Sequence, residues 1–359
     1  MMEKLPPETQ TLYVELVERL LAVEARRTIG HAPGSFTAKT VKGETYYYFQ
    51  YSEPGGATRQ VYVGKRAPAL ERVVAKFESE RDEYRTDRAH LQRLCAQLRA
   101  GGALVTDTAS ARILRALADS GVFRLGGVLI GTHAFAVLGN ILGTRWTSAD
   151  IKTQDVDVAA ETTLAVALPE IAADIPKALD SLQMGFLPVP SLNPKNPSTS
   201  FKIRGKPLRV DIVTPQKRPT SQKPVLISRF NVAAQPLPFL DYLLEGAEAG
   251  AIVDGGGVLV QVPTPARFAL HKLIVSGARQ VSAHGKSLKD LHQAAQVLAV
   301  LAEERPGDVM LAWEAMERRG TAWTRRLRAG LSALQRKDPF AHEKVLEVLP
   351  ALRERRPVA

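Results

Sequence analysis

The segment IKTQDVDV places two aspartates on alternate positions, Asp155 and Asp157, with a valine after each of them. Successive side chains of a strand point to opposite faces, so the two carboxylates would share one side and Val156 and Val158 would share the other. Two like charges on one face favour a cation between them. We therefore expect a bound cation at this strand.

A third carboxylate and a glycine turn accompany this pair. Asp211 lies among apolar residues in LRVDIVTP, and Gly131-Thr132 follows the apolar segment GGVLI. Mg²⁺ is usually held by one or two carboxylates plus substrate phosphates, and two such ions can clamp an in-line displacement at phosphorus. A Gly131-Thr132 turn at the start of a helix would offer backbone N–H groups to a phosphate. These residues predict phosphoryl or nucleotidyl transfer.

Arg209 lies two positions before Asp211, so the same alternation places it on the face of that aspartate. Its guanidinium could hold a substrate phosphate or neutralise the carboxylates. The sequence leaves both roles open.

The order of these motifs carries a resemblance. GTHAFAVLG, RWT, DVDVA and LRVDIVTP follow one another as a glycine turn, an Asp-x-Asp strand and a later strand carboxylate. This order is similar to that of the nucleotidyltransferase superfamily that shares the palm of DNA polymerase beta. PTPARFALHKLIVSGARQ and SLKDLHQA resemble the helical motifs of the bacterial minimal nucleotidyltransferases, a branch that includes abortive-infection toxins. The resemblance covers roughly residues 105–295.

The resemblance implies an NTP as substrate and Mg²⁺ or Mn²⁺ as cofactor. The catalytic residues it implies, which would also bind the metal, are Asp155, Asp157 and Asp211. With Arg209 added from its place beside Asp211, the expected nucleotide-binding residues are Gly131, Thr132, Arg209, Lys272 and Asp290. The sequence departs from the family pattern at the turn, where Thr132 and His133 replace the commoner Ser or Gly. It also departs in the long connection to Asp155, which includes Arg145.

Each of these residues also has a structural interpretation. An Asp-x-Asp strand can be the solvated face of an edge strand, and Lys272 can be a surface lysine on a helix. Asp290 can pair with Lys286, four residues before it on the same helix. His133 can be a hydrogen-bonded histidine of the fold.

Composition narrows the class of protein. The chain has 359 residues, a formal net charge of +11 and one cysteine, which excludes an internal disulfide and any cysteine-cluster zinc site. No apolar run approaches the roughly 20 residues needed to cross a bilayer, and MMEKLPPETQ lacks the layout of a signal peptide. We expect a cytoplasmic protein without a membrane partner, and the positive charge favours a polyanionic one.

The periodicity predicts three regions in an α+β fold. Residues 1–100 are expected to form a helix over 5–29, a two- or three-stranded ribbon over 31–65 and a long helix over 68–99. Residues 101–262 are expected to form the nucleotidyltransferase palm, a mixed sheet with flanking helices, one of them over PEIAADIPKALDSLQ at 169–183. Residues 263–359 are expected to be helical. The ribbon interleaves tyrosines with lysines and arginines, which could bind nucleic acid or could be the ordinary alternation of a small sheet.

The predicted reaction moves a nucleoside monophosphate from an NTP to an acceptor hydroxyl. The basic charge favours RNA or tRNA as acceptor. The resemblance to the toxin branch implies a possible protein partner such as an antitoxin. The alternative is a catalytically silent nucleotidyltransferase fold that acts as a scaffold for nucleic acid or a protein partner.

Overall fold

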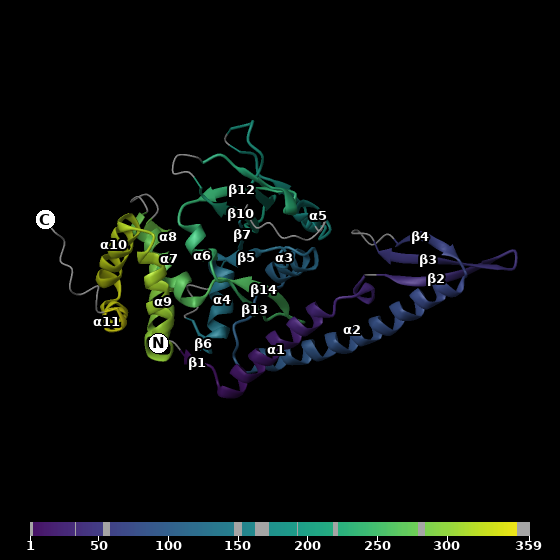
Figure 1. Ribbon diagram of the computed structural model, residues 1–359, viewed down its shortest axis with the longest axis horizontal. Helices are drawn as coiled ribbons and strands as arrows, with labels where there is room; N and C mark the ends of the chain where they lie inside the picture. The colour runs from purple at the N-terminus through teal and green to yellow at the C-terminus, as the bar shows by residue number, and fades with distance from the viewer. Residues whose placement is uncertain are drawn as a thin grey trace.

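The computed structural model describes residues 3–32, 34–52, 58–146, 153–161, 172–191, 193–217, 222–278 and 284–349. It combines a mixed central sheet, an arm of two helices that ends in a β-ribbon, and a group of helices near the carboxyl terminus (Figure 1). The predicted α+β class is confirmed. No helix within these ranges is long and apolar enough to span a bilayer.

The arm is built by the first hundred residues. After the short strand β1 (Glu3–Lys4), α1 (Pro7–Ala25) lies beside the carboxyl-terminal part of α2 (Pro68–Ala100), and α2 reaches outward to the ribbon (Figure 1). A 3₁₀ turn, η1 (Ile29–His31), leads into the ribbon strands β2 (Ser35–Val41), β3 (Glu44–Ser52) and β4 (Thr58–Lys65). The three strands pair antiparallel in sequence order, which confirms the predicted ribbon.

Apolar side chains tie the base of the arm to the rest of the chain. Tyr13 and Leu16 of α1 pack with Leu94 and Cys95 of α2 in a buried cluster that also includes Ala251. The Tyr13 hydroxyl donates to the Ala251 carbonyl at 3.0 Å and accepts from its N–H at the same distance. Burial raises the pKa of the Cys95 thiol to about 11, so this cysteine is a packing residue.

The central sheet contains seven strands among the described residues. In spatial order its main path is β11 (Val225–Ile227), β12 (Val232–Leu237), β10 (Arg209–Pro215), β7 (Asp155–Ala160) and β5 (Gly127–Ile130). β10 runs parallel to β7 and β12, and β5 runs antiparallel to β7. β9 (Ser200–Ile203) pairs with the first half of β10, and β8 (Phe186–Pro188) pairs with β9.

Short elements surround this sheet. The helices are α3 (Thr108–Asp119), α4 (Gly131–Ile141), α5 (Ile175–Asp180), the 3₁₀ turn η2 (Ser228–Phe230) and α6 (Leu240–Leu244). Two further strand pairs are β13 (Glu248–Ile252) with β14 (Val258–Val262), and β1 with β6 (Thr144–Arg145). The carboxyl-terminal helices are α7 (Pro265–Ala278), α8 (His284–Glu304), α9 (Pro306–Glu317), α10 (Thr321–Lys337) and α11 (Pro339–Val348). The predicted helical character after residue 263 is confirmed.

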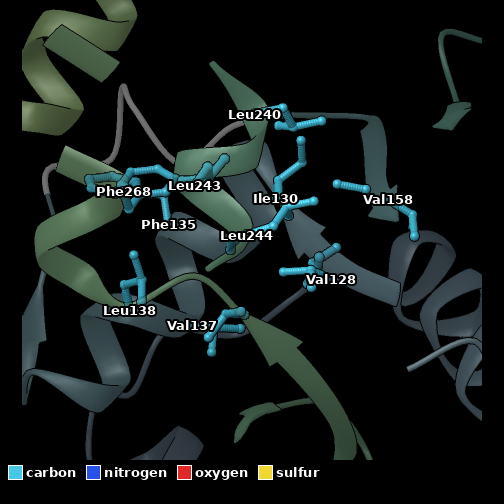
Figure 2. Packing of buried hydrophobic residues seen from close by; sticks show 14 of the residues in the cluster. Val128, Ile130, Phe135, Val137, Leu138, Val158, Leu240, Leu243, Leu244 and Phe268 are labelled. Carbon is cyan, nitrogen blue, oxygen red and sulfur yellow. The ribbon is translucent and has the colours of Figure 1, made fainter. Parts of the chain in front are cut away.

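One large apolar core holds the central sheet against its helices. Figure 2 shows side chains of β5, β7, α4, α6 and α7 in this cluster, among them Ile130, Val158, Phe135, Leu243 and Phe268. The rings of Phe135 and Phe268 stack with centroids 6.0 Å apart. Burial of these side chains fixes the turn between β5 and α4, because both elements contribute to the same core.

Two predicted helices differ in extent from the observed ones. The helix predicted over 5–29 ends at Ala25, because Thr28 is extended and Gly30 packs against α2 in the 3₁₀ turn. The helix predicted for PEIAADIPKALDSLQ spans only Ile175–Asp180. Asp174 caps it by accepting from the Lys177 N–H at 2.8 Å, which sets its start. Residues 169–171 of that prediction lie outside the described residues.

Candidate functional site

Strand pairing places the predicted carboxylates next to each other. In the parallel pair β7 and β10, Asp157 is opposite Asp211 and Asp155 is opposite Arg209. Side chains at paired positions of neighbouring strands project to the same face of a sheet. The result is a two-by-two arrangement of three carboxylates and one guanidinium, in which Asp155 is exposed and the other three side chains are half-buried.

The opposite face of the same two strands is apolar. Val156, Val158, Val210 and Ile212 are fully buried in the core. The alternation predicted from DVDV is therefore confirmed, and it explains why the aspartates cannot turn inward. A flip of either strand would place carboxylates in the core and valines at the surface.

Gly131 brings the start of α4 against Asp157. Ile130, the last residue of β5, is paired with Asp157, and Gly131 follows it with φ +70°. A Cβ on Gly131 would lie 2.4 Å from Asp157 Oδ2, which is closer than any real contact. Only glycine allows both this backbone conformation and this approach. The strand, turn and helix predicted around Gly131-Thr132 are present, and the turn abuts the aspartate pair.

Arg209 and Ser200 both contact one oxygen of Asp211. Arg209 Nε donates to Asp211 Oδ1 at 2.7 Å, and Arg209 Nη2 donates to Ser200 Oγ at 2.9 Å. The Ser200 hydroxyl donates to the same Oδ1. Of the two roles that the sequence left open for Arg209, the structure shows neutralisation of a carboxylate, and phosphate binding stays a prediction.

Ser200 was missed at the sequence level. It lies on β9 directly opposite Asp211 in the antiparallel pair β9 and β10, so its side chain belongs to the face of the aspartates. The sequence does contain a signal for this contact, because SFKIRGKPLRVDI has the pattern of a β-hairpin. Counting outward from its turn places Ser200 opposite Asp211.

Thr132 and His133 follow Gly131 in the first turn of α4, and both are buried. Burial lowers the pKa of His133 to about 4, so the imidazole is neutral at physiological pH. Its Nε2 is buried without a hydrogen-bond partner among the described residues. His133 is therefore a residue of the packed interior, but the hydrogen bond that its structural interpretation predicted is not found at Nε2 among the described residues.

Lys272 and Asp290, which were predicted separately, form an ion pair. Lys272 Nζ on α7 lies 2.6 Å from Asp290 Oδ1 on α8, with side chains 16% and 7% exposed. Lys272 is thus not a plain surface lysine, and Asp290 has a partner on another helix. The alternative partner, Lys286, has a side chain outside the described residues. Contact of this pair with a nucleotide stays a prediction.

The carboxylate oxygens of these aspartates are the type of ligand that a hard cation prefers. Within the described ranges, no three or more His, Cys, Asp or Glu side chains are already gathered as a metal site. Mg²⁺ does not need such a cage, because it commonly uses one or two carboxylates together with waters and substrate phosphates. Asp157 and Asp211 could supply those carboxylates, and Gly131 leaves room for close approach beside them.

Arg145 has an exposed side chain on β6, a strand that pairs with β1, and it is followed by Trp146, whose indole N–H donates to the Phe135 carbonyl. Two arginines nearer the carboxyl terminus have partners within the chain. On α10 and before it, Arg319 bonds Asp241 and Glu245, and Arg326 stacks over Phe239. The connection at 147–152, where an insertion was expected, lies outside the described residues.

The ribbon has two different faces. Phe36 and Phe49 pack edge-on against Phe77 of α2, with ring centroids 5.1 and 5.6 Å from it. The other face carries Tyr48 beside Tyr62, with Lys39 over the Tyr48 ring at 5.0 Å. The interpretation of alternation in a small sheet therefore accounts for Phe36 and Phe49, and binding of nucleic acid by the tyrosine face stays a prediction.

Comparison with known proteins places this geometry in context. The model of a family described as nucleotidyltransferase matches residues 108–317, which run from the start of α3 to the end of α9. A comparison with curated proteins found no match. Among solved structures, the chain is similar to an antigenic nucleotidyltransferase-like protein from Paracoccidioides brasiliensis, with 15% sequence identity, a TM-score of 0.37, and coverage of 66% of this chain and 93% of that chain. The family match contains Gly131, all three aspartates and the Lys272–Asp290 pair.

Proposed function

The chain belongs to this nucleotidyltransferase family, and we propose that it moves a nucleoside monophosphate from an NTP to an acceptor hydroxyl. The observation that carries the proposal is the pairing of Asp157 with Asp211 on neighbouring strands, at the point where Gly131 begins α4. A carboxylate pair beside a helix start offers anionic ligands for a cation and backbone N–H groups for phosphate. Both are needed to bind a metal-chelated triphosphate.

In the proposed reaction an oxygen of the acceptor hydroxyl bonds to the α-phosphorus while the bond from that phosphorus to the bridging oxygen breaks. Pyrophosphate leaves and the hydroxyl proton is released. Asp155, Asp157 and Asp211 are the proposed ligands of Mg²⁺, which would neutralise charge on the attacking and leaving oxygens. The first turn of α4 would hold the phosphates, with Gly131 allowing their approach.

Arg209 has a defined part in this proposal. It holds Asp211 Oδ1 together with Ser200, so Oδ2 of Asp211 is the oxygen assigned to the metal and the acceptor. A guanidinium beside the site can turn from the carboxylate to a bound phosphate, because it carries five N–H donors. Lys272, held by Asp290, is proposed to contact the nucleotide from α7.

The acceptor is proposed to be RNA or tRNA, in keeping with the net charge of +11. Membership of the toxin branch, with an antitoxin as protein partner, is part of the same proposal. It rests on the resemblance of the motif order and on the palm that this order implies.

One observation favours a second candidate. Arg209 and Ser200 already satisfy Asp211 Oδ1 without a metal, as they would in a silent domain that serves as a scaffold. Thermal stabilisation separates the two candidates. The enzyme is expected to melt at a higher temperature with an NTP and Mg²⁺ together than with either alone, and Asp157→Asn is expected to remove that increase. Equal melting temperatures for wild type under all conditions would favour the scaffold.

A further inference from the structure

A second basic site lies away from the aspartates, where the arm meets the central region. A cavity of about 670 Å³ opens between the end of α1, the middle of α2, α3 and the start of β14. Figure 1 shows α1 and α2 side by side, with α3 and β14 near them. Its lining includes six arginines: Arg27, Arg81, Arg85, Arg88, Arg115 and Arg124. Two carboxylates, Glu24 and Asp119, line it as well.

Three of these arginines form a row on α2. Arg81, Arg85 and Arg88 are four and three residues apart, which places them on one face of the helix. The row is about 10 Å long, since a helix rises about 1.5 Å per residue. A row of this length can follow more than one phosphate of a strand, because phosphates of a duplex strand rise about 3.4 Å each.

The other three arginines come from elements that border α2. Arg124 and Arg27 share Glu24, and Arg27 Nη2 also donates to the Asp119 carbonyl at 3.1 Å. Arg115 is held by Asp254, with its Nη2 2.8 Å from Oδ2. These ion pairs fix the guanidiniums in place while leaving other N–H groups of each one for a ligand.

Among the described residues, two arginines of the row on α2 have no carboxylate partner, whereas Arg85 pairs with Asp82 at 3.3 Å. Arg81 lies over the Phe77 ring and Arg88 over the Tyr84 ring, and neither has a carboxylate partner within the part of the chain that the structure describes. Arg81 Nη1 is moreover buried without a hydrogen-bond partner among those residues. A buried guanidinium nitrogen is costly to leave unsatisfied, so an anionic ligand would stabilise it.

We infer that this cavity binds the phosphate backbone of a single-stranded nucleic acid. The arginines lie along a line and on more than one element, which suits a linear polyanion better than one compact anion. Tyr84 and His31, with ring centroids 4.3 Å apart in the same lining, offer flat surfaces on which a base can stack. The site is separate from the proposed catalytic residues, so the inference stands without them.

The test is direct binding of a fluorescein-labelled single-stranded RNA oligonucleotide, measured by anisotropy without Mg²⁺ or NTP. Arg81→Gln/Arg88→Gln is compared with Arg72→Gln/Arg93→Gln, which removes the same charge from exposed positions of α2 that do not line the cavity. The cavity variant is expected to bind at least about tenfold more weakly. Its slope of log affinity against log salt, between about 50 and 200 mM, is expected to fall by about 1.4, at about 0.7 per lost phosphate contact.

Equal affinities and equal salt slopes for the two double variants would overturn the inference. Arg88→Gln alone, at an exposed position, repeats the test if the double variant melts early, and its slope is expected to fall by about 0.7. Tripolyphosphate provides the second arm. Tripolyphosphate could bind the wild type tightly and the cavity variant weakly, while the RNA binds both equally well. In that case the cavity binds a compact polyphosphate, and its assignment to a single-stranded nucleic acid is wrong.

Discussion

Asp157 and Asp211 stand opposite each other on the parallel strands β7 and β10, so two carboxylates lie side by side on one face of the central sheet. This placement costs electrostatic free energy unless a cation lies between or beside them. In the structure the guanidinium of Arg209 supplies that charge at Asp211 Oδ1. The competition between Arg209 and a metal for the same carboxylate gives the first prediction.

Arg209→Met is expected to lower the Mg²⁺ concentration needed for half-maximal transfer, because Asp211 then has no competing guanidinium. The same change is expected to raise the KM for the NTP by about tenfold, the cost of one charge-assisted hydrogen bond to phosphate. Steady-state transfer rates over a grid of Mg²⁺ and NTP concentrations measure both. Lys223→Met, at an exposed position before β11, is the charge-matched control. A fall in the Mg²⁺ requirement with an unchanged KM would limit Arg209 to neutralisation.

Gly131→Ala tests the close approach of α4 to Asp157. A non-glycine residue at positive φ costs roughly 1–2 kcal/mol, and the new Cβ would also overlap Asp157 Oδ2. Gly185→Ala is the matched control, since φ there is +78° with open space around the Cβ. Both variants are expected to lose stability in urea unfolding, Gly131→Ala more because of the overlap, and only Gly131→Ala is expected to lose most NTP binding. Undiminished NTP binding in Gly131→Ala would show that phosphate does not use this turn.

The Lys272–Asp290 pair is expected to behave as a buried ion pair. Lys272→Met and Asp290→Asn each leave one buried partner uncompensated and are expected to cost about 3 kcal/mol of unfolding free energy. The double variant is expected to cost clearly less than the sum, in a double-mutant cycle from urea unfolding. The exposed pair of Glu314 and Arg318 is the control, with an expected coupling below about 1 kcal/mol. Additive costs at Lys272 and Asp290 would contradict the pairing.

His133 is expected to make the protein less stable in mild acid. Its pKa is about 4 in the folded chain because of burial, against about 6.5 when unfolded. Its contribution is therefore complete above about pH 6.5 and is lost as the pH falls toward about 4, since only the unfolded chain takes up the proton. The expected loss between about pH 7 and pH 5 is about 2 kcal/mol.

His133→Gln is expected to remove this part of the pH dependence, and the readout is the slope of unfolding free energy with pH. An unchanged slope in His133→Gln would mean that the imidazole takes up a proton in the folded protein.

The parts of the site that follow from alternation could be predicted from sequence. DVDV fixes which side chains of β7 share a face, and VLIGTH marks a buried strand that turns into a helix at a glycine. Long helices such as α2 could also be predicted from the periodicity of their apolar residues. These features are local, so the periods of strand and helix are enough to find them.

The remaining features depend on contacts between distant segments. Lys272 and Asp290 meet because α7 packs on α8, and no period along either helix shows that. β12 contains Pro236 and β13 contains Gly250, and both residue types have low strand propensity. Propensity along the sequence therefore does not indicate these two strands, which are stabilised by pairing with neighbouring strands in the folded protein. The arginine cavity joins residues from Leu20 to Gln261, and only the folded arm brings them together.

Transfer of label from each of the four α-³²P NTPs to cellular RNA or protein, with Mg²⁺, tests the central claim most directly. Wild type is compared with Asp211→Asn, which keeps the shape of the side chain, and with Asp180→Asn at an exposed position of α5. We predict a labelled product with wild type and Asp180→Asn, reduced at least about a hundredfold in Asp211→Asn. Absence of label with every nucleotide from a folded wild-type protein, or full labelling by Asp211→Asn, would contradict nucleotidyl transfer at this site.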